Sequence, residues 1–129
     1  MKAISLLLVD DNPTFLRMAK LFLAQFERLE VVGTAAGGKE GLKLALNVRP
    51  DIALVDLNMP DLHGLDVIPK MREALPETRI IALTMLDEDG YREASLAAGA
   101  SEFVSKETMN VDLPLAIYRL AGQGEANAK

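Results

Sequence analysis

Short apolar runs that end on polar side chains constrain the fold of this chain more than any other feature of its sequence. In chain order they are Ile4–Val9 before Asp10-Asp11, Ile52–Val55 before Asp56, Ile80–Leu83 before Thr84, and a run around Phe103-Val104 before Lys106. Apolar residues at successive positions are typical of parallel strands that helices cover on both faces. The runs therefore predict an α/β protein whose polar strand ends meet at one edge of a sheet, where ligands of such folds bind.

Segments with helical character separate these runs. We expect helices at Pro13–Arg28, Lys39–Val48, Leu65–Leu75, Glu88–Ala98 and Val111–Ala121. Asn12-Pro13 supplies an N-cap followed by proline at the first helical position, and Gly99 is suited to end the fourth helix. The alternation of strand and helix is the βα repeat, and five such units predict a three-layer sandwich.

Aromatic and small residues recur at helical spacing in the first expected helix. They are Phe15, Ala19, Phe22 and Phe26. A stripe with this period is typical of the face of a helix that packs on the core, so we assign these side chains to packing.

Length and composition set bounds on the function. The 129 residues suffice for one core, so we expect one domain over residues 1–121, with 122–129 as a disordered tail or the start of a linker. The chain has no cysteine, which favours the cytoplasm, and no apolar stretch of the length that spans a membrane. Its net charge of −5 argues against direct nucleic-acid binding by this domain.

Three carboxylates are expected at neighbouring strand ends. Asp10, Asp11 and Asp56 would repel one another strongly enough to require a cation, and oxygen-only ligands favour Mg²⁺ over zinc. One of these carboxylates could then attack phosphorus and form an acyl phosphate. Thr84 and Lys106 would be natural ligands of the phosphate oxygens, as a hydroxyl donor and a compact cation.

These motifs together resemble the receiver domain of two-component response regulators, over about Ile4 to Ala121. The motifs, in order, are Asp10-Asp11, Asp56-Leu57-Asn58-Met59-Pro60 followed by Gly64, then Thr84, and Phe103-Val104-Ser105-Lys106. The resemblance implies a flavodoxin-like, doubly wound (βα)5 fold with a five-stranded parallel sheet in the order 2-1-3-4-5.

The resemblance also implies roles for single residues. Asp56 would be the phosphoacceptor, Mg²⁺ would be bound by Asp11, by Asp56 and by the backbone carbonyl of Asn58, and Asp10 would contribute through water. Lys106 would bind the phosphoryl group. Thr84 would move toward that group, and Phe103 would follow it inward as the switch aromatic, which would reshape the face formed by the fourth helix, fifth strand and fifth helix.

The chain departs from the family pattern at three positions. Glu107 follows Lys106 where many receivers have proline, so we expect a trans peptide bond there, as in receivers with helix-turn-helix outputs. Met85 follows Thr84 where a small residue is usual, and we expect it to slow phosphorylation by small donors. Leu86 lies where a side chain influences access of water, and we expect a longer phosphoryl lifetime than with a charged residue.

The implied function is a module that takes a phosphoryl group from a histidine kinase or phosphotransfer protein and controls an output domain, such as a DNA-binding transcriptional regulator, or a partner. Such a module is not an enzyme, since it turns over only itself. A phosphorylation-independent interaction receiver is an alternative. An aspartate-dependent phosphatase is disfavoured because Leu57-Asn58 follows Asp56 where its acid would be, and a flavin carrier because Asp10–Thr14 offers carboxylates where a phosphate cradle needs glycines and hydroxyls.

Partners other than the kinase are less constrained by the sequence. A homodimer that forms on phosphorylation could use the fourth and fifth helices, through Tyr91, Leu96 and Tyr118, or the first and fifth helices. The sequence does not choose between these two faces.

Overall fold

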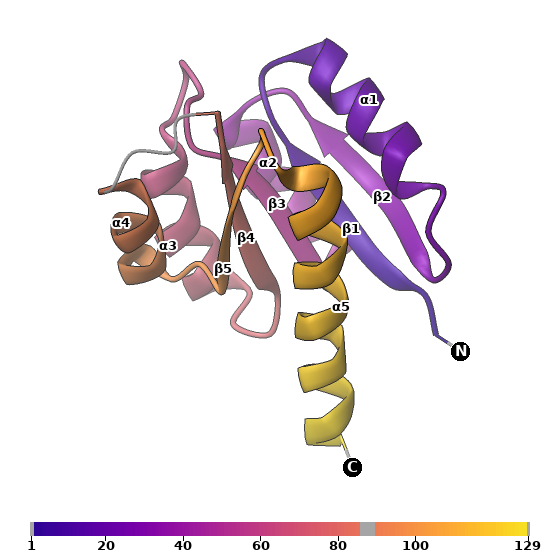
Figure 1. Cartoon of the computed structure of the whole chain (residues 1–129). Helices are drawn as coiled ribbons and strands as arrows, with labels where there is room; N and C mark the ends of the chain where they lie inside the picture. Colours follow the sequence, from indigo (N-terminus) through magenta and orange to yellow (C-terminus); the bar gives the residue numbers. More distant parts are fainter. Residues whose placement is uncertain (1, 86–89, 129) are drawn as a thin grey trace.

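Five parallel strands form the centre of the computed structural model, which describes residues 2–85 and 90–128, with side chains described as far as 122. The strands are β1 (Ile4–Val9), β2 (Leu29–Ala35), β3 (Ile52–Asp56), β4 (Arg79–Thr84) and β5 (Glu102–Ser105). They lie in the order β2-β1-β3-β4-β5, with every neighbouring pair parallel (Figure 1). This order confirms the predicted flavodoxin-like sheet.

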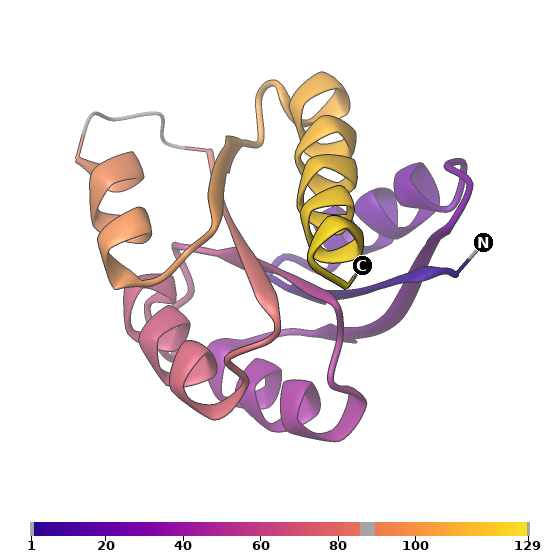
Figure 2. The ribbon, with the colours of Figure 1, turned by 90° about the horizontal axis from the view of Figure 1, so that it is seen from below.

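Helices cover both faces of the sheet. The helices are α1 (Pro13–Leu23), α2 (Gly38–Val48), α3 (Gly64–Ala74), α4 (Tyr91–Ala98) and α5 (Met109–Ala128). The view along the sheet shows α1 and α5 on one face and α2, α3 and α4 on the other (Figure 2). The three predicted layers are therefore present.

A separate apolar core lies on each side of the sheet. On the α1 and α5 side, Leu6 and Leu8 of β1 pack with Leu23 of α1 and Ile117 of α5. On the other side, side chains of β1 and β3 that point the opposite way pack with α2 and α3. Both faces of the central strands are thus buried, which explains why their sequences are continuously apolar.

Several boundaries differ from those expected from the sequence. The first helix ends at Leu23 instead of Arg28, and Arg28 has a positive φ of 73° just before β2 begins. Phe26 nevertheless packs against the core from the connecting turn. The fourth helix begins at Tyr91, while the expected start at Glu88 lies outside the described residues.

The last helix also differs from the expected boundary. It continues past Ala121 to Ala128, whereas we expected the helix to end at Ala121. That residues 122–129 begin a linker stays a prediction. No helix within residues 2–85 and 90–128 is long and apolar enough to cross a bilayer.

Candidate functional site

The carboxyl ends of four strands bring the predicted site residues to one edge of the sheet. Asp10 follows the last residue of β1, Asp56 ends β3, Thr84 ends β4, and Lys106 follows β5. The strands are in register here, since Val9 pairs with Val55 and Asp56 with Leu83. The parallel sheet therefore explains why residues 96 positions apart in sequence become neighbours.

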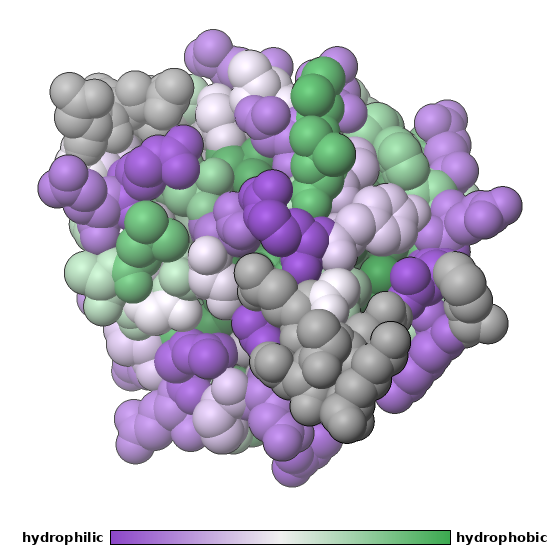
Figure 3. Space-filling view, turned by 60° about the horizontal axis from the view of Figure 1, so that its bottom comes forward, coloured by the Kyte–Doolittle hydropathy of each residue, from purple (hydrophilic) through white to green (hydrophobic). Residues whose placement is uncertain are grey.

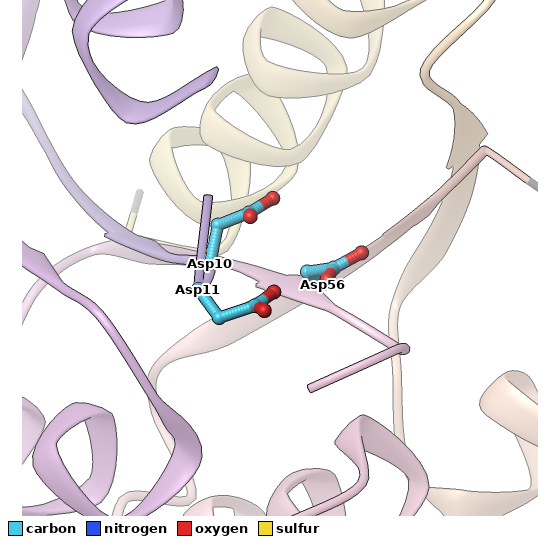
Figure 4. A group of neighbouring side chains, drawn as sticks. All are labelled: Asp10, Asp11 and Asp56. Atoms are coloured by element: carbon cyan, nitrogen blue, oxygen red, sulfur yellow. The ribbon is translucent and has the colours of Figure 1, made fainter. Parts of the chain in front are cut away.

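Three carboxylates of this edge face a common space. In Figure 4 the side chains of Asp10, Asp11 and Asp56 extend to the same side of their strand ends, and one oxygen of each lies within 4.8 Å of the other two. Asp10 and Asp56 are buried, whereas Asp11 is exposed. A set of oxygen donors with one side open to solvent fits a hard divalent cation such as Mg²⁺, which keeps part of its water shell.

Each oxygen of Asp10 has its own partner. The backbone N–H of Asn12 donates to Oδ1 over 2.8 Å, and the Lys106 ammonium donates to Oδ2 over 2.6 Å. These two hydrogen bonds fix the orientation of a carboxylate that is only 1% exposed. Asp10 therefore anchors Lys106 at the site.

The Lys106 ammonium lies between two carboxylates and an aromatic ring. Its Nζ is 3.4 Å from Oδ1 of Asp56, and it lies 4.0 Å from the centroid of the Phe15 ring. The side chain is 9% exposed, so the cation is largely removed from water. Its charge is instead balanced by Asp10 and Asp56, as a buried ammonium requires.

The electrostatics of the site act most strongly on Asp56. Burial, reinforced by the negative charge of Asp10, raises the pKa of Asp56 from an ordinary 3.8 to about 6, although Lys106 and a hydrogen bond from the Asn58 backbone oppose this change. The carboxylate form of Asp56 is therefore costly even with the Lys106 ammonium beside it. This is a further reason to expect a divalent ion here.

Thr84 connects the end of β4 to two neighbouring segments. Its hydroxyl accepts a hydrogen bond from the side-chain amide of Asn58 over 3.3 Å, and its backbone carbonyl accepts one from the Lys106 N–H over 2.8 Å. Thr84 is fully buried. The residue predicted to report on the phosphoryl group is thus linked to the loop that follows Asp56 and to the loop that carries Lys106.

The predicted switch aromatic is in a buried position. Phe103 is 5% exposed and packs in the core between the sheet and α2, α3 and α4, and the Arg92 guanidinium of α4 lies 4.9 Å from its ring centroid. Its role as a switch stays a prediction.

Of the two residues expected to control access to Asp56, Met85 is 57% exposed beside Thr84. The other, Leu86, lies outside the described residues.

The peptide bond between Lys106 and Glu107 is trans, as expected from the absence of proline after Lys106.

Two contacts of the site region were missed from the sequence. Phe15 was assigned to packing alone, and Asp61 was not singled out. Asp61 accepts hydrogen bonds from the backbone N–H groups of Gly38 and Lys39 over 3.0 and 3.1 Å, and these hydrogen bonds hold its pKa below the ordinary value. Gly37, the residue at the N-cap of α2, has no side chain to do this. In the sequence, the only sign that α2 needs a cap from another segment is the glycine at its N-cap. That glycine does not indicate that Asp61 supplies the cap.

Comparisons with known proteins agree with this geometry. The family model described as response regulator receiver domain matches residues 6–118. The transcriptional regulatory protein MctR of Rhizobium johnstonii is 36% identical over 121 residues, which are 94% of this chain and 56% of MctR. The nitrate/nitrite response regulator protein NarL of Escherichia coli K12 is 32% identical over 91% of this chain and 54% of NarL. The chain thus spans about half the length of these curated relatives.

Solved structures show the same similarity in three dimensions. A two-component response regulator of the LuxR family from Aurantimonas sp. SI85-9A1 superposes with a TM-score of 0.88 at 29% identity, covering 94% of this chain and 87% of that one. The signal receiver domain of the putative response regulator NarL from Mycobacterium tuberculosis gives 0.87 at 28% identity, covering 95% and 98%.

Proposed function

The chain belongs to the response regulator receiver domain family, and on this premise we propose that it accepts a phosphoryl group on Asp56 from a histidine kinase or a phosphotransfer protein, in a reaction that depends on Mg²⁺. The observation that carries this proposal is the position of the Asp56 carboxylate, close to two further carboxylates and to the Lys106 ammonium. Lone acidic residues at strand ends are common, but this combination is suited to phosphoryl transfer.

The transfer step uses the chain's own residues as follows. An oxygen of Asp56 forms a bond to phosphorus while the bond from phosphorus to the donor nitrogen breaks, and the electron pair of that bond stays on the donor imidazole. Lys106, which lies 3.4 Å from Asp56, offsets negative charge on the phosphoryl oxygens. Asp10 keeps the ammonium at this place.

The metal would be held by Asp11, by Asp56 and by the backbone carbonyl of Asn58, with Asp10 contributing through water. When bound, Mg²⁺ would neutralise charge that accumulates on the carboxylates and the phosphoryl oxygens. The acidic cluster supports this assignment, because three close carboxylates and one ammonium leave a net negative charge at the site.

The signal would travel from Thr84 to the face formed by α4, β5 and α5. A phosphoryl oxygen would accept a hydrogen bond from the Thr84 hydroxyl and draw that hydroxyl away from the Asn58 amide, and Phe103 would readjust against Arg92 of α4. Figure 3 looks onto this side and shows hydrophobic groups over α4 and α5 with hydrophilic groups between them. Leu96 of α4 and Leu115 of α5 are among the exposed apolar residues. These features suit a contact surface, for an output domain or for a homodimer that forms on phosphorylation.

The output would be a DNA-binding domain outside this chain. One relative is described as a transcriptional regulatory protein, and the chain corresponds to about half of its length. The chain's own net charge of −5 disfavours contact with a nucleic-acid backbone, so it would control DNA binding without taking part in it. We propose that the chain does not catalyse the turnover of an external substrate.

Trapping of the acyl phosphate would test the proposal. The protein is incubated with Mg²⁺ and acetyl phosphate, reduced with borohydride, digested, and mapped by peptide mass spectrometry. We expect the modified residue at Asp56, in the wild type and equally in Asp66→Asn, which removes an exposed carboxylate of α3. Modification at another residue would contradict Asp56 as the acceptor, and no modification at all would favour the phosphorylation-independent interaction receiver.

A further inference from the structure

Phe15 of α1 forms one wall of the pocket that holds the Lys106 ammonium. The Nζ atom lies 4.0 Å from the ring centroid, which is well within the distance at which an aromatic face attracts a cation. The same Nζ is 2.6 Å from Asp10 and 3.4 Å from Asp56. The ammonium of this largely buried side chain, which is 9% exposed, is thus in contact with two carboxylates and one aromatic face.

The loop after β1 places both the carboxylate and the ring. Asn12 caps α1, because its side chain accepts hydrogen bonds from the N–H groups of Thr14 and Phe15 over 3.0 and 3.1 Å. Its own backbone N–H donates to Asp10. The position of Phe15 is therefore coupled through Asn12 to the carboxylate that binds the same ammonium.

The ring is not required by the core alone. Ala19 and Leu23 of α1 are fully buried, while Phe15, near the carboxyl edge of the sheet, is only partly buried. A leucine would serve for packing at such a position, but it would offer no negative face to the ammonium. A lysine side chain has four rotatable bonds, so a further contact that restricts its head reduces the positions available to the charge.

From these contacts we infer that Phe15 is a positioning residue for phosphoryl transfer, and that its aromatic face holds the Lys106 ammonium where it can reach both Asp10 and the phosphoryl group on Asp56. The inference rests on the proposed function, because Lys106 matters for transfer only if Asp56 accepts a phosphoryl group. It adds an electrostatic role for a side chain that the helical spacing assigned to packing.

Stepwise fluorination of the ring separates this role from packing. Fluorine atoms preserve the shape of phenylalanine but weaken the negative face, so Phe15 is replaced by 4-fluoro-, 3,5-difluoro- and 3,4,5-trifluorophenylalanine in the full chain. We expect the rate constant for labelling by acetyl phosphate with Mg²⁺ to fall with each added fluorine, by about fivefold over the series. The rate constant of Phe15→Leu should be lower than that of the wild type by a similar factor.

Phe22 is the matched control on the same helix. It packs edge-on against Phe26 with ring centroids 5.1 Å apart, and the same fluorinated residues there should leave the rate constant unchanged. Equal rate constants across the Phe15 series would overturn the inference, and so would an equal fall at Phe22.

A measurement without phosphoryl transfer separates this inference from the proposed function. In the unphosphorylated protein, the Lys106 Hε protons should show an upfield ring-current shift by NMR, and Phe15→Leu should abolish it. If neither the wild type nor Met85→Ala is labelled, the proposed function fails. The NMR result then decides the inference by itself, because absence of the shift would show that the ring does not contact Lys106.

Discussion

Replacing Asp56 by asparagine is expected to stabilise the fold at neutral pH when no metal is present. In the folded protein, burial and the charge of Asp10 raise the pKa of Asp56 to about 6, compared with an ordinary value of 3.8. Between these two values the folded state binds more protons than the unfolded state, so stability falls as the pH rises through this window. Above about pH 6 the folded wild type carries the full free-energy cost of ionising the buried Asp56. The asparagine side chain does not ionise, so the variant does not carry this cost.

The size of the effect follows from the pKa difference. Each tenfold change in a protonation equilibrium is worth about 1.4 kcal/mol, so a difference of about two in pKa corresponds to about 3 kcal/mol. Water and counter-ions at the open edge of the sheet screen part of this, and we expect about 1–2 kcal/mol. The pKa of about 6 already includes the favourable contact with Lys106.

Urea denaturation in the presence of a chelator measures this gain. At about pH 7.5 the Asp56→Asn midpoint should exceed that of the wild type with an unchanged m-value, and at about pH 4.5 most of the difference should disappear. Saturating Mg²⁺ should also reduce the difference in midpoint, because the wild type, which keeps all three carboxylates, binds the ion more tightly and is stabilised more than the variant. Glu73→Gln, which removes an exposed charge on α3, should show no such pH dependence. A variant that is less stable than the wild type at about pH 7.5, or equally stabilised at both pH values, would refute the reasoning.

Three further predictions follow from contacts near the site. A Cβ on Gly64 would lie 2.5 Å from the Asp56 carbonyl oxygen and 2.6 Å from the Leu57 Cα, so Gly64→Ala should lower the free energy of unfolding by about 1–3 kcal/mol in urea, whereas Gly122→Ala, in open space, should not lower it. Asp61→Ala should lower the thermal midpoint, because α2 loses the side chain that caps its N-terminus. In the double variant Asp61→Ala/Gly37→Ser, the serine at the N-cap should restore the midpoint, and no restoration would contradict the capping role of Asp61. Met85→Ala should speed labelling by acetyl phosphate a few fold, and an unchanged rate would show that this exposed side chain does not limit access.

The arrangement of the fold could be predicted because its central strands carry a strong signal. Strands buried on both faces, such as Ile52–Asp56, read as uninterrupted apolar sequence, and parallel connections bring their carboxyl ends to one edge. The closeness of Asp10, Asp11 and Asp56 then follows from topology. The edge strand Leu29–Ala35 was not located, because most of its residues are partly or fully exposed and it contains glycine.

The features that were missed depend on distances between separate segments. The spacing of Phe22 and Phe26 suggested a longer first helix, yet the chain leaves the helix after Leu23 and still buries part of Phe26 from a turn. The contact of Phe15 with Lys106 joins residues on α1 and after β5, and no periodicity in either segment indicates it. Local patterns thus predict elements and edges, whereas contacts between side chains of different loops require coordinates.

The most direct test of a magnesium-dependent phosphoacceptor is the intact mass of the protein after incubation with acetyl phosphate. We predict a single phosphoryl adduct on the wild type when Mg²⁺ is present, and none when Mg²⁺ is chelated or when Asp56 is replaced by asparagine. An adduct of the same yield on Asp56→Asn, or one that forms equally without Mg²⁺, would contradict the assignment of the acidic cluster as the phosphoryl-transfer site.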